Sequence, residues 1–150
     1  RDLETDPDIS LKSKPIISDN SIDNIKEILL EISNLKATHG HGKLYASILK
    51  NINFNKAYDK AKEMQNMGLI SYGPVVLTGT NCSRFVASIM LASKPHWLIG
   101  LRLKLPFCLS PSPKRNISIA NSIYHVVNMK NYMKINKSYL KSYFSSIERI

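Results

Sequence analysis

The segment from Gly79 to Val86 constrains the fold of this chain more than any other. It runs Gly-Thr-Asn-Cys-Ser-Arg-Phe-Val, so a glycine turn leads directly into an apolar stretch. Thr80 or Asn81 can cap a helix that begins there. The side chains expected on its buried face are Phe85, Val86, Ile89 and Met90. The pattern therefore predicts a helix with Cys82 in its first turn.

A cysteine in the first turn of a helix has the environment of a nucleophile. The unpaired amides and the helix dipole favour the thiolate. The same amides, above all that of Cys82 itself, can stabilise an oxyanion on an attacked carbonyl. A small buried cysteine with a structural role is the alternative. Position alone leaves both interpretations open.

The rest of the chain predicts a single α+β domain over residues 21–150, preceded by an acidic entry segment over 1–20. Before the cysteine helix we expect a helix from Ser21 to about residue 37, capped by Asp19 or Ser21, a strand over 44–49, a helix over 55–67 ended by Gly68, and a loop over 69–80. After it we expect a strand over 96–109, a loop over 109–113, an extended region over 117–127 and a basic helix over 136–150.

Two short motifs resemble a known family. Tyr72-Gly73-Pro74 precedes Asn81-Cys82-Ser83-x-Phe85-Val86, with Pro74 eight residues before Cys82, and together they resemble the core motif of NlpC-type papain-like cysteine peptidases. The element order over residues 43–93 is similar to the permuted YiiX/YaeF-like branch, which is related to lecithin:retinol acyltransferase. The resemblance implies a papain-like domain whose small antiparallel sheet packs on the cysteine helix. It also implies that Cys82 is the nucleophile and that Tyr72 shapes the oxyanion site. Arg84 stands where the family has a small glycine.

The histidine that serves Cys82 has three candidates. His41 comes before the cysteine helix, as in the permuted branch, and is the first candidate. His125, in Tyr-His-Val-Val, follows Cys82 by 43 residues, which is the order of the non-permuted branch. The third candidate lies upstream of residue 1, because the chain lacks an initiator Met and is expected to be a fragment or the C-terminal part of a longer protein. The structural alternatives are a solvated loop for His41 and a partly buried strand for His125.

The charge of the chain is uneven. The net charge is +10, and residues 94–150 hold ten basic side chains against one acid, Glu148. This basic C-terminal third suits an anionic surface. The alternative is a compositional bias, since Lys outnumbers Arg 16 to 5. No specific nucleic-acid partner is predicted, because such grooves more often use Arg clusters interleaved with aromatics.

Several classes of protein are excluded. The apolar runs are far shorter than the roughly 20 residues that span a bilayer, and no signal-peptide pattern is present. Cys82 and Cys108 are too few for a disulfide scaffold. His39 and His41 lack a third ligand nearby, so neither a metal nor a cofactor is expected.

The sequence therefore predicts a thiol hydrolase or acyltransferase. Its substrate would be a peptide, another amide or a lipid-like ester, with a cell-wall peptide among the candidates implied by the resemblance. The competing hypothesis is a catalytically inactive papain-like binding module whose basic C-terminal third binds an anionic partner. The two differ in whether a histidine serves Cys82.

Overall fold

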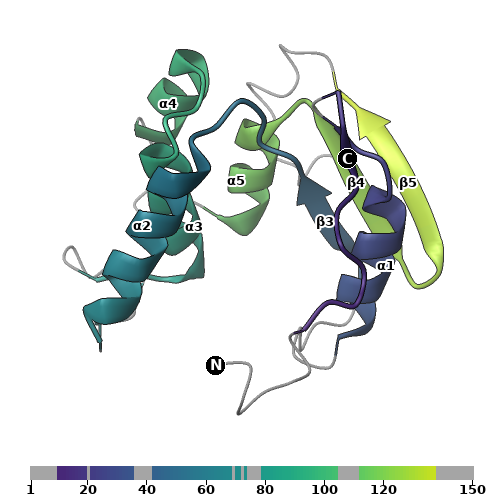
Figure 1. Cartoon of the computed structure of the whole chain (residues 1–150), viewed down its shortest axis with the longest axis horizontal. Coiled ribbons are helices and arrows are strands. Elements are labelled where there is room, and N and C mark those ends of the chain that lie inside the picture. The colour runs from purple at the N-terminus through teal and green to yellow at the C-terminus, as the bar shows by residue number, and fades with distance from the viewer. Residues whose placement is uncertain are drawn as a thin grey trace. The chain divides into compact units, whose positions relative to one another are not determined.

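The computed structural model gives the chain an α+β fold, as predicted (Figure 1). It describes residues 10–19, 21–35, 42–68, 70–71, 73, 79–104 and 112–137. The helices in these ranges are α1 (Ile25–Asn34), α2 (Phe54–Asn66), α3 (Cys82–Ala92), α4 (Trp97–Lys104) and α5 (Pro113–Ala120). The strands are β1 (Ile17–Ser18), β2 (Ser21–Ile22), β3 (Leu44–Ser47), β4 (Ile123–Asn128) and β5 (Asn131–Asn136).

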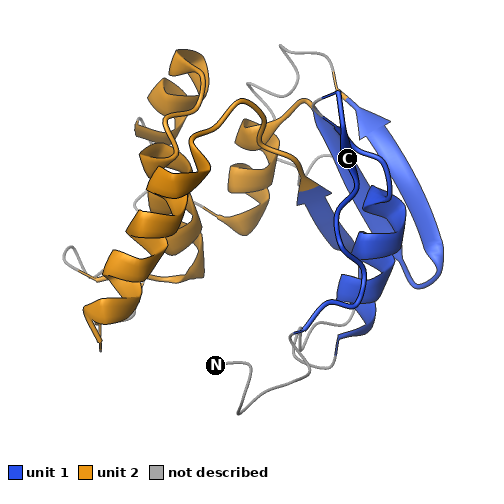
Figure 2. Cartoon of the chain, viewed as in Figure 1, with its two compact units in different colours: residues 1–46, 123–136 blue, residues 47–122, 137–150 orange. Residues whose placement is uncertain are grey.

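The chain divides into two compact units, which Figure 2 shows in different colours. Unit 1 comprises residues 1–46 and 123–136, and unit 2 comprises residues 47–122 and 137–150. Compact units of this size can belong to one domain. The single domain expected over residues 21–150 therefore stays a prediction.

Unit 1 is built on a β-hairpin. Strands β4 and β5 pair antiparallel from Ile123 opposite Asn136 to Asn128 opposite Asn131, and the strand order of the sheet is β3-β4-β5. Helix α1 packs against β4. The buried apolar side chains of these two elements are Ile28, Leu29, Tyr124, Val126 and Val127. The central strand β4 is therefore the most deeply buried element of the unit.

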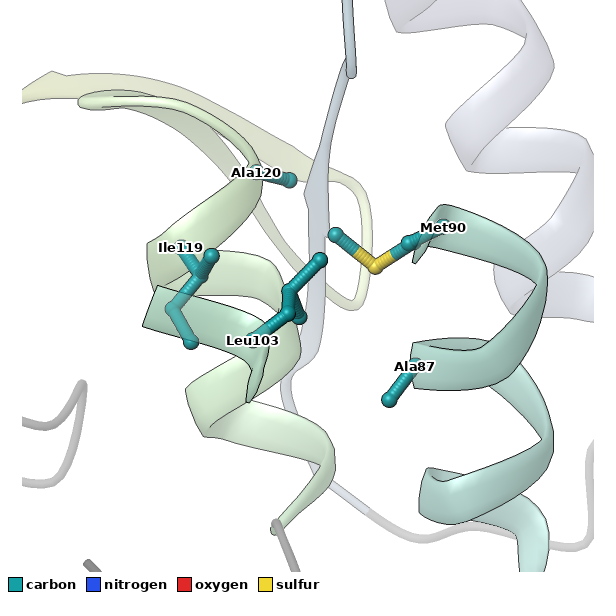
Figure 3. Close-up of a cluster of buried hydrophobic side chains, with 5 residues drawn as sticks. All are labelled: Ala87, Met90, Leu103, Ile119 and Ala120. Carbon is teal, nitrogen blue, oxygen red and sulfur yellow. The ribbon is translucent and has the colours of Figure 1, made fainter. Parts of the chain in front are cut away.

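Unit 2 is helical, and its core lies between α3, α4 and α5. The buried side chains of this core are Ala87, Met90, Leu103, Ile119 and Ala120. Figure 3 shows Met90 of α3 and Leu103 of α4 pointing toward the side chains of α5. Helix α2 packs beside α3 without a fully buried side chain of its own. Helices α3, α4 and α5 thus share one small apolar core, and this core holds α3 in place.

Several predicted elements are confirmed. Strand β3 lies within the predicted range 44–49, and α2 spans Phe54–Asn66 against a predicted 55–67. Gly68 follows the end of α2 with a φ of +69°, the left-handed conformation that makes glycine the common residue after a helix. Helix α3 begins at Cys82, as the glycine turn and its capping residues indicated.

The first helix begins later than predicted, at Ile25, and neither Asp19 nor Ser21 caps it. Side chains just before the helix bind the preceding chain instead. The amide of Asn24 accepts a hydrogen bond from Ile16 N (2.9 Å) and donates one to Lys14 O (2.8 Å). These bonds accompany the short β1–β2 pairing, so residues 21–22 are extended. The entry segment over 1–20 likewise contains β1.

The predicted strand over 96–109 is wrong, because residues 97–104 form helix α4. Over eight residues, alternation and helical spacing place apolar side chains almost equally well. In α4 the buried Leu103 and the partly buried Ile99 are four residues apart and pack on the same core, whereas Trp97 is exposed. Leucine is also a strong helix former. Residues 105–109 lie outside the described part of the chain.

The predicted extended region over 117–127 is confirmed for residues 123–127, which lie in β4, and is wrong for residues 117–120, which belong to α5. Pro113 occupies the start of this helix, and the Ser112 hydroxyl accepts a hydrogen bond from Arg115 N (3.2 Å). Proline at the first position and serine at the cap are strong helix-start signals. Asn136 ends β5, so the predicted C-terminal helix does not begin there. Residues 138–150 lie outside the described part of the chain.

Candidate active site at the start of helix α3

Cys82 is the first residue of α3, and its side chain is exposed. The preceding residue, Asn81, caps the helix: its side-chain oxygen accepts a hydrogen bond from Arg84 N at 2.9 Å. The cap thus occupies the third amide of the turn rather than that of Cys82. The predicted position of the thiol, at the capped start of a helix, is confirmed.

The backbone before Cys82 is held by hydrogen bonds. Thr80 N donates to Ser71 O (2.8 Å), and Gly73 N donates to Thr80 O (3.1 Å). The Arg84 guanidinium reaches back and donates to Gly79 O at 3.3 Å. The bulky side chain of Arg84 therefore contacts the turn that leads into the cysteine helix.

The buried face of α3 differs from the predicted one. Its buried residues are Ser83, Ala87 and Met90, whereas Val86 is 43% exposed. Phe85 and Ile89 are only partly buried. A helix turns about 100° per residue, so the small side chains that follow Cys82 face α5 and the thiol faces outward.

Asn116 of α5 supports the start of α3, and sequence reasoning missed it. Its side-chain amide donates a hydrogen bond to Ser83 O at 2.8 Å, and the residue is 3% exposed. Its other side-chain atom, Oδ1, is buried with no hydrogen-bond partner among the described residues. The only local signal for this role is a polar residue in the middle of an amphipathic stretch. That signal does not indicate that Ser83 is the hydrogen-bond partner.

His125 lies on β4, as predicted for a strand residue, and is 5% exposed. Its Nδ1 forms a 2.8 Å hydrogen bond with the Tyr132 hydroxyl, and the two rings stack with centroids 5.7 Å apart. Burial, and secondarily the charge of Lys134, lowers the pKa of His125 below its ordinary value. If Nδ1 carries the proton and donates to the phenol, Nε2 keeps the lone pair that a general base needs.

The structure describes one of the three predicted site residues. Cys82 is described, whereas His41 and Tyr72 lie outside the described residues, as does Cys108. The alternative base, His125, belongs to unit 1, and Cys82 belongs to unit 2. In the described part of the chain, no three His, Cys, Asp or Glu residues are grouped to hold a metal ion. No helix within these ranges is long and apolar enough to cross a membrane.

An α+β fold with an exposed cysteine at the capped start of a helix is compatible with a small papain-like domain. A family model described as Type VI secretion system effector TseH-like matches residues 1–99 of this chain, about two thirds of its length. The chain therefore belongs to the TseH-like family of type VI secretion system effectors.

Membership of this family is consistent with the predicted NlpC-type papain-like superfamily. It does not test the prediction of the permuted branch. The matched range includes Cys82, His41 and Tyr72, and it ends before His125. Comparisons with curated proteins and with solved structures give no significant match.

Proposed function

We propose that this chain is a papain-like effector hydrolase that uses Cys82 as its nucleophile. One observation carries the proposal: an exposed thiol begins a capped helix inside the range that matches the effector family. A structural cysteine would instead be expected among the buried residues of α3, where Ser83 and Ala87 lie.

In the proposed mechanism the Cys82 sulfur attacks the carbonyl carbon of an amide or ester. A histidine accepts the thiol proton, and the carbonyl electron pair moves to oxygen, where the amide of Cys82 stabilises it. The bond to the leaving group then breaks, and the histidine returns the proton to the departing amine or alcohol. Water hydrolyses the resulting thioester with the same histidine as base. An acceptor alcohol or amine in place of water makes the reaction an acyl transfer.

Two histidines of the chain compete for the role of base. His41 precedes Cys82 within the family-matched range, as the permuted branch requires. His125 has one ring nitrogen fixed by Tyr132, which orients a catalytic imidazole in the way a third group does in a catalytic triad. His41 stays the first candidate, and Tyr72 keeps its proposed place at the oxyanion site. A base upstream of residue 1 is the third possibility.

The proposed substrate is an amide or ester with an accessible carbonyl, in a cell-wall peptide or a lipid-like molecule. A small activated ester tests the chemistry without knowledge of the natural substrate. With p-nitrophenyl acetate we expect release of p-nitrophenolate and an acetyl group on the Cys82 peptide. Cys82→Ala should abolish both, and Cys108→Ala, the matched control, should keep both. Release of p-nitrophenolate by Cys82→Ala at the rate of the unchanged protein would contradict the proposal.

The same assay separates the candidate bases. His41→Ala or His125→Gln should slow acetylation by about 100-fold or more, since general base catalysis contributes about 10²–10⁴-fold. Only the variant that removes the true base should do so. If neither variant slows acetylation, neither His41 nor His125 is the base, and a segment upstream of residue 1 becomes the next source to test.

The alternative is a binding module without activity, and Arg84 favours it because this bulky cation occupies the place of a small glycine. Such a module would use the basic C-terminal third on an anionic surface. Retention on heparin should then fall steeply between low and physiological salt. Lys130 and Lys134 are exposed. Lys130→Gln and Lys134→Gln should therefore reduce retention on heparin while leaving the fold intact. If the protein is not retained on heparin even at low salt, this alternative is contradicted.

A further inference from the structure

Unit 2 contains a cavity that the proposed hydrolase chemistry does not use. Its volume is about 500 Å³, within the range of small-molecule sites. Residues that follow the C-terminal end of α3, including Lys94, line it, whereas Cys82 begins that helix. The 11 residues of α3 span about 16 Å, so the thiol and the cavity lie at opposite ends of the helix. The cavity is therefore a separate site.

The lining of the cavity is basic at its rim and apolar at its floor. The basic side chains are Lys50, Lys94, His96 and Arg102, and among the described residues no Asp or Glu lines it. The floor includes Ile99 and the buried Ile119, which belong to the core of unit 2. A charged rim above an apolar floor suits an anion that carries an apolar group.

Acidic side chains are few in the segment that carries this rim. Residues 47–122 contain ten basic side chains and two acids, Asp59 and Glu63. Both acids lie on α2, and Glu63 pairs with Lys60 at 2.7 Å. The Lys94 ammonium group interacts with that of Lys56, and this contact lowers the pKa of Lys56 through a side-chain hydrogen bond and like-charge repulsion. Within residues 47–122, basic side chains therefore far outnumber acidic ones.

Hydrogen bonds fix the walls of the cavity. The segment that carries Lys50 and Asn51 is tied at both ends: Asn121 Nδ2 donates to Ile48 O (2.9 Å), and Asn53 N donates to Ser93 O (2.8 Å). These bonds link the segment to the ends of α5 and α3. A wall held in this way loses little freedom when a ligand binds.

Lys94 occupies a position where glycine is more favourable. It follows the end of α3 with a φ of +51°, a left-handed conformation that lysine rarely adopts. Strained residues of this kind cluster at functional sites. The chain therefore keeps an ammonium group at the cavity despite the cost in backbone strain and in repulsion from Lys56.

From this geometry we infer that the cavity is a binding site for a phosphate monoester. The phosphate would lie among Lys50, Lys94 and Arg102, and the organic group that it esterifies would lie on the apolar floor. Three basic side chains match a phosphate dianion better than a monoanionic carboxylate. The inference does not rest on the proposed hydrolase activity. The ester can be a soluble metabolite or a lipid headgroup, which share this chemistry.

Phenyl phosphate is the probe, and Trp97 is the reporter. Trp97 is the single tryptophan of the chain, and its ring lies 6.0 Å from that of His96 at the rim. At physiological salt, where diffuse surface charge is screened, phenyl phosphate should change the fluorescence of Trp97 and give a saturable calorimetric signal. Inorganic phosphate should bind more weakly because it lacks the apolar group. Equal affinities would contradict the assigned role of the floor.

Charge variants test the assignment. Lys94→Gln should weaken phenyl phosphate binding by about tenfold, the effect expected for one lost charged hydrogen bond, and Lys50→Gln should act in the same direction. Lys114→Gln is the matched control, because it removes the same charge from an exposed position of α5 outside the cavity. An equal loss in Lys114→Gln would overturn the site in favour of diffuse charge.

Vesicles distinguish the two sources of the ester. Vesicles that contain phosphatidic acid, compared with phosphatidylcholine alone, should compete with phenyl phosphate if the cavity takes a lipid headgroup. Absence of competition together with phenyl phosphate binding supports a soluble ester. Binding to phosphatidic acid vesicles without any binding of phenyl phosphate would overturn the inference, because the membrane would then be bound by a surface other than the cavity.

Discussion

The side-chain amide of Asn116 donates a hydrogen bond to the main-chain carbonyl of Ser83, so α5 holds the residue next to Cys82. The same side chain leaves Oδ1 buried without a partner in the described part of the chain. One hydrogen bond contributes about 0.5–1.5 kcal/mol, whereas a buried unpaired polar atom costs about 1–3 kcal/mol. On these magnitudes we expect Asn116 to add little to the stability of the fold and to act chiefly by orienting the first turn of α3.

Replacement of Asn116 by leucine separates these two effects. Asn116→Leu has a similar shape and should leave the free energy of unfolding unchanged or raise it by about 1 kcal/mol. The same variant should slow alkylation of Cys82, because the first turn of α3 loses its contact with α5. Urea unfolding and iodoacetamide kinetics measure the two quantities. A loss of several kcal/mol would show that Asn116 is primarily a structural residue.

The buried imidazole of His125 makes stability depend on pH. Its pKa in the folded chain is lowered from 6.5, chiefly by burial, so below about pH 6.5 the unfolded chain takes up a proton that the folded chain resists. The free energy of unfolding should therefore fall as the pH falls from 7 to 5.5. His125→Gln should show a smaller fall over the same range. If the two profiles are parallel, His125 does not titrate as the structure requires.

Lys94→Gly should stabilise the chain. A left-handed residue with a Cβ costs about 1–2 kcal/mol, and the greater freedom of glycine in the unfolded chain offsets about 0.5–1 kcal/mol of the gain. We expect a net increase of about 0.5–1 kcal/mol in the free energy of unfolding, together with weaker phenyl phosphate binding. Lys114 lies in helix α5 and not at a left-handed position, so Lys114→Gly should destabilise that helix instead. A less stable Lys94→Gly variant would show that the strain is absent in solution.

The sequence predicted those elements whose signals are local. Gly79 and Asn81 indicate the start of α3, and Gly68 indicates the end of α2. These signals are local because turn and cap residues act on the backbone next to them. The pattern around Leu103 fits two periods, and only its contact with the core of unit 2 selects the helix. Packing of this kind depends on residues distant in the sequence, which periodicity alone does not identify.

The candidate site shows the same division. The position of Cys82 follows from the turn before it and was predicted. The support from Asn116 joins two helices whose contacting residues are 33 positions apart, and the bond between His125 and Tyr132 joins the two strands of a hairpin. Strand β5 was not predicted, so the partner of His125 could not be named.

The most direct test of the proposed function compares the two cysteines of the chain. Folded protein is treated with iodoacetamide near neutral pH, and peptide mass mapping follows the modification of Cys82 and Cys108 over time. Protein unfolded in urea is the control, in which both thiols should react at similar rates. We predict that in the folded chain Cys82 reacts at least tenfold faster than in the unfolded control, and faster than Cys108. A Cys82 that reacts no faster folded than unfolded would contradict its assignment as the nucleophile.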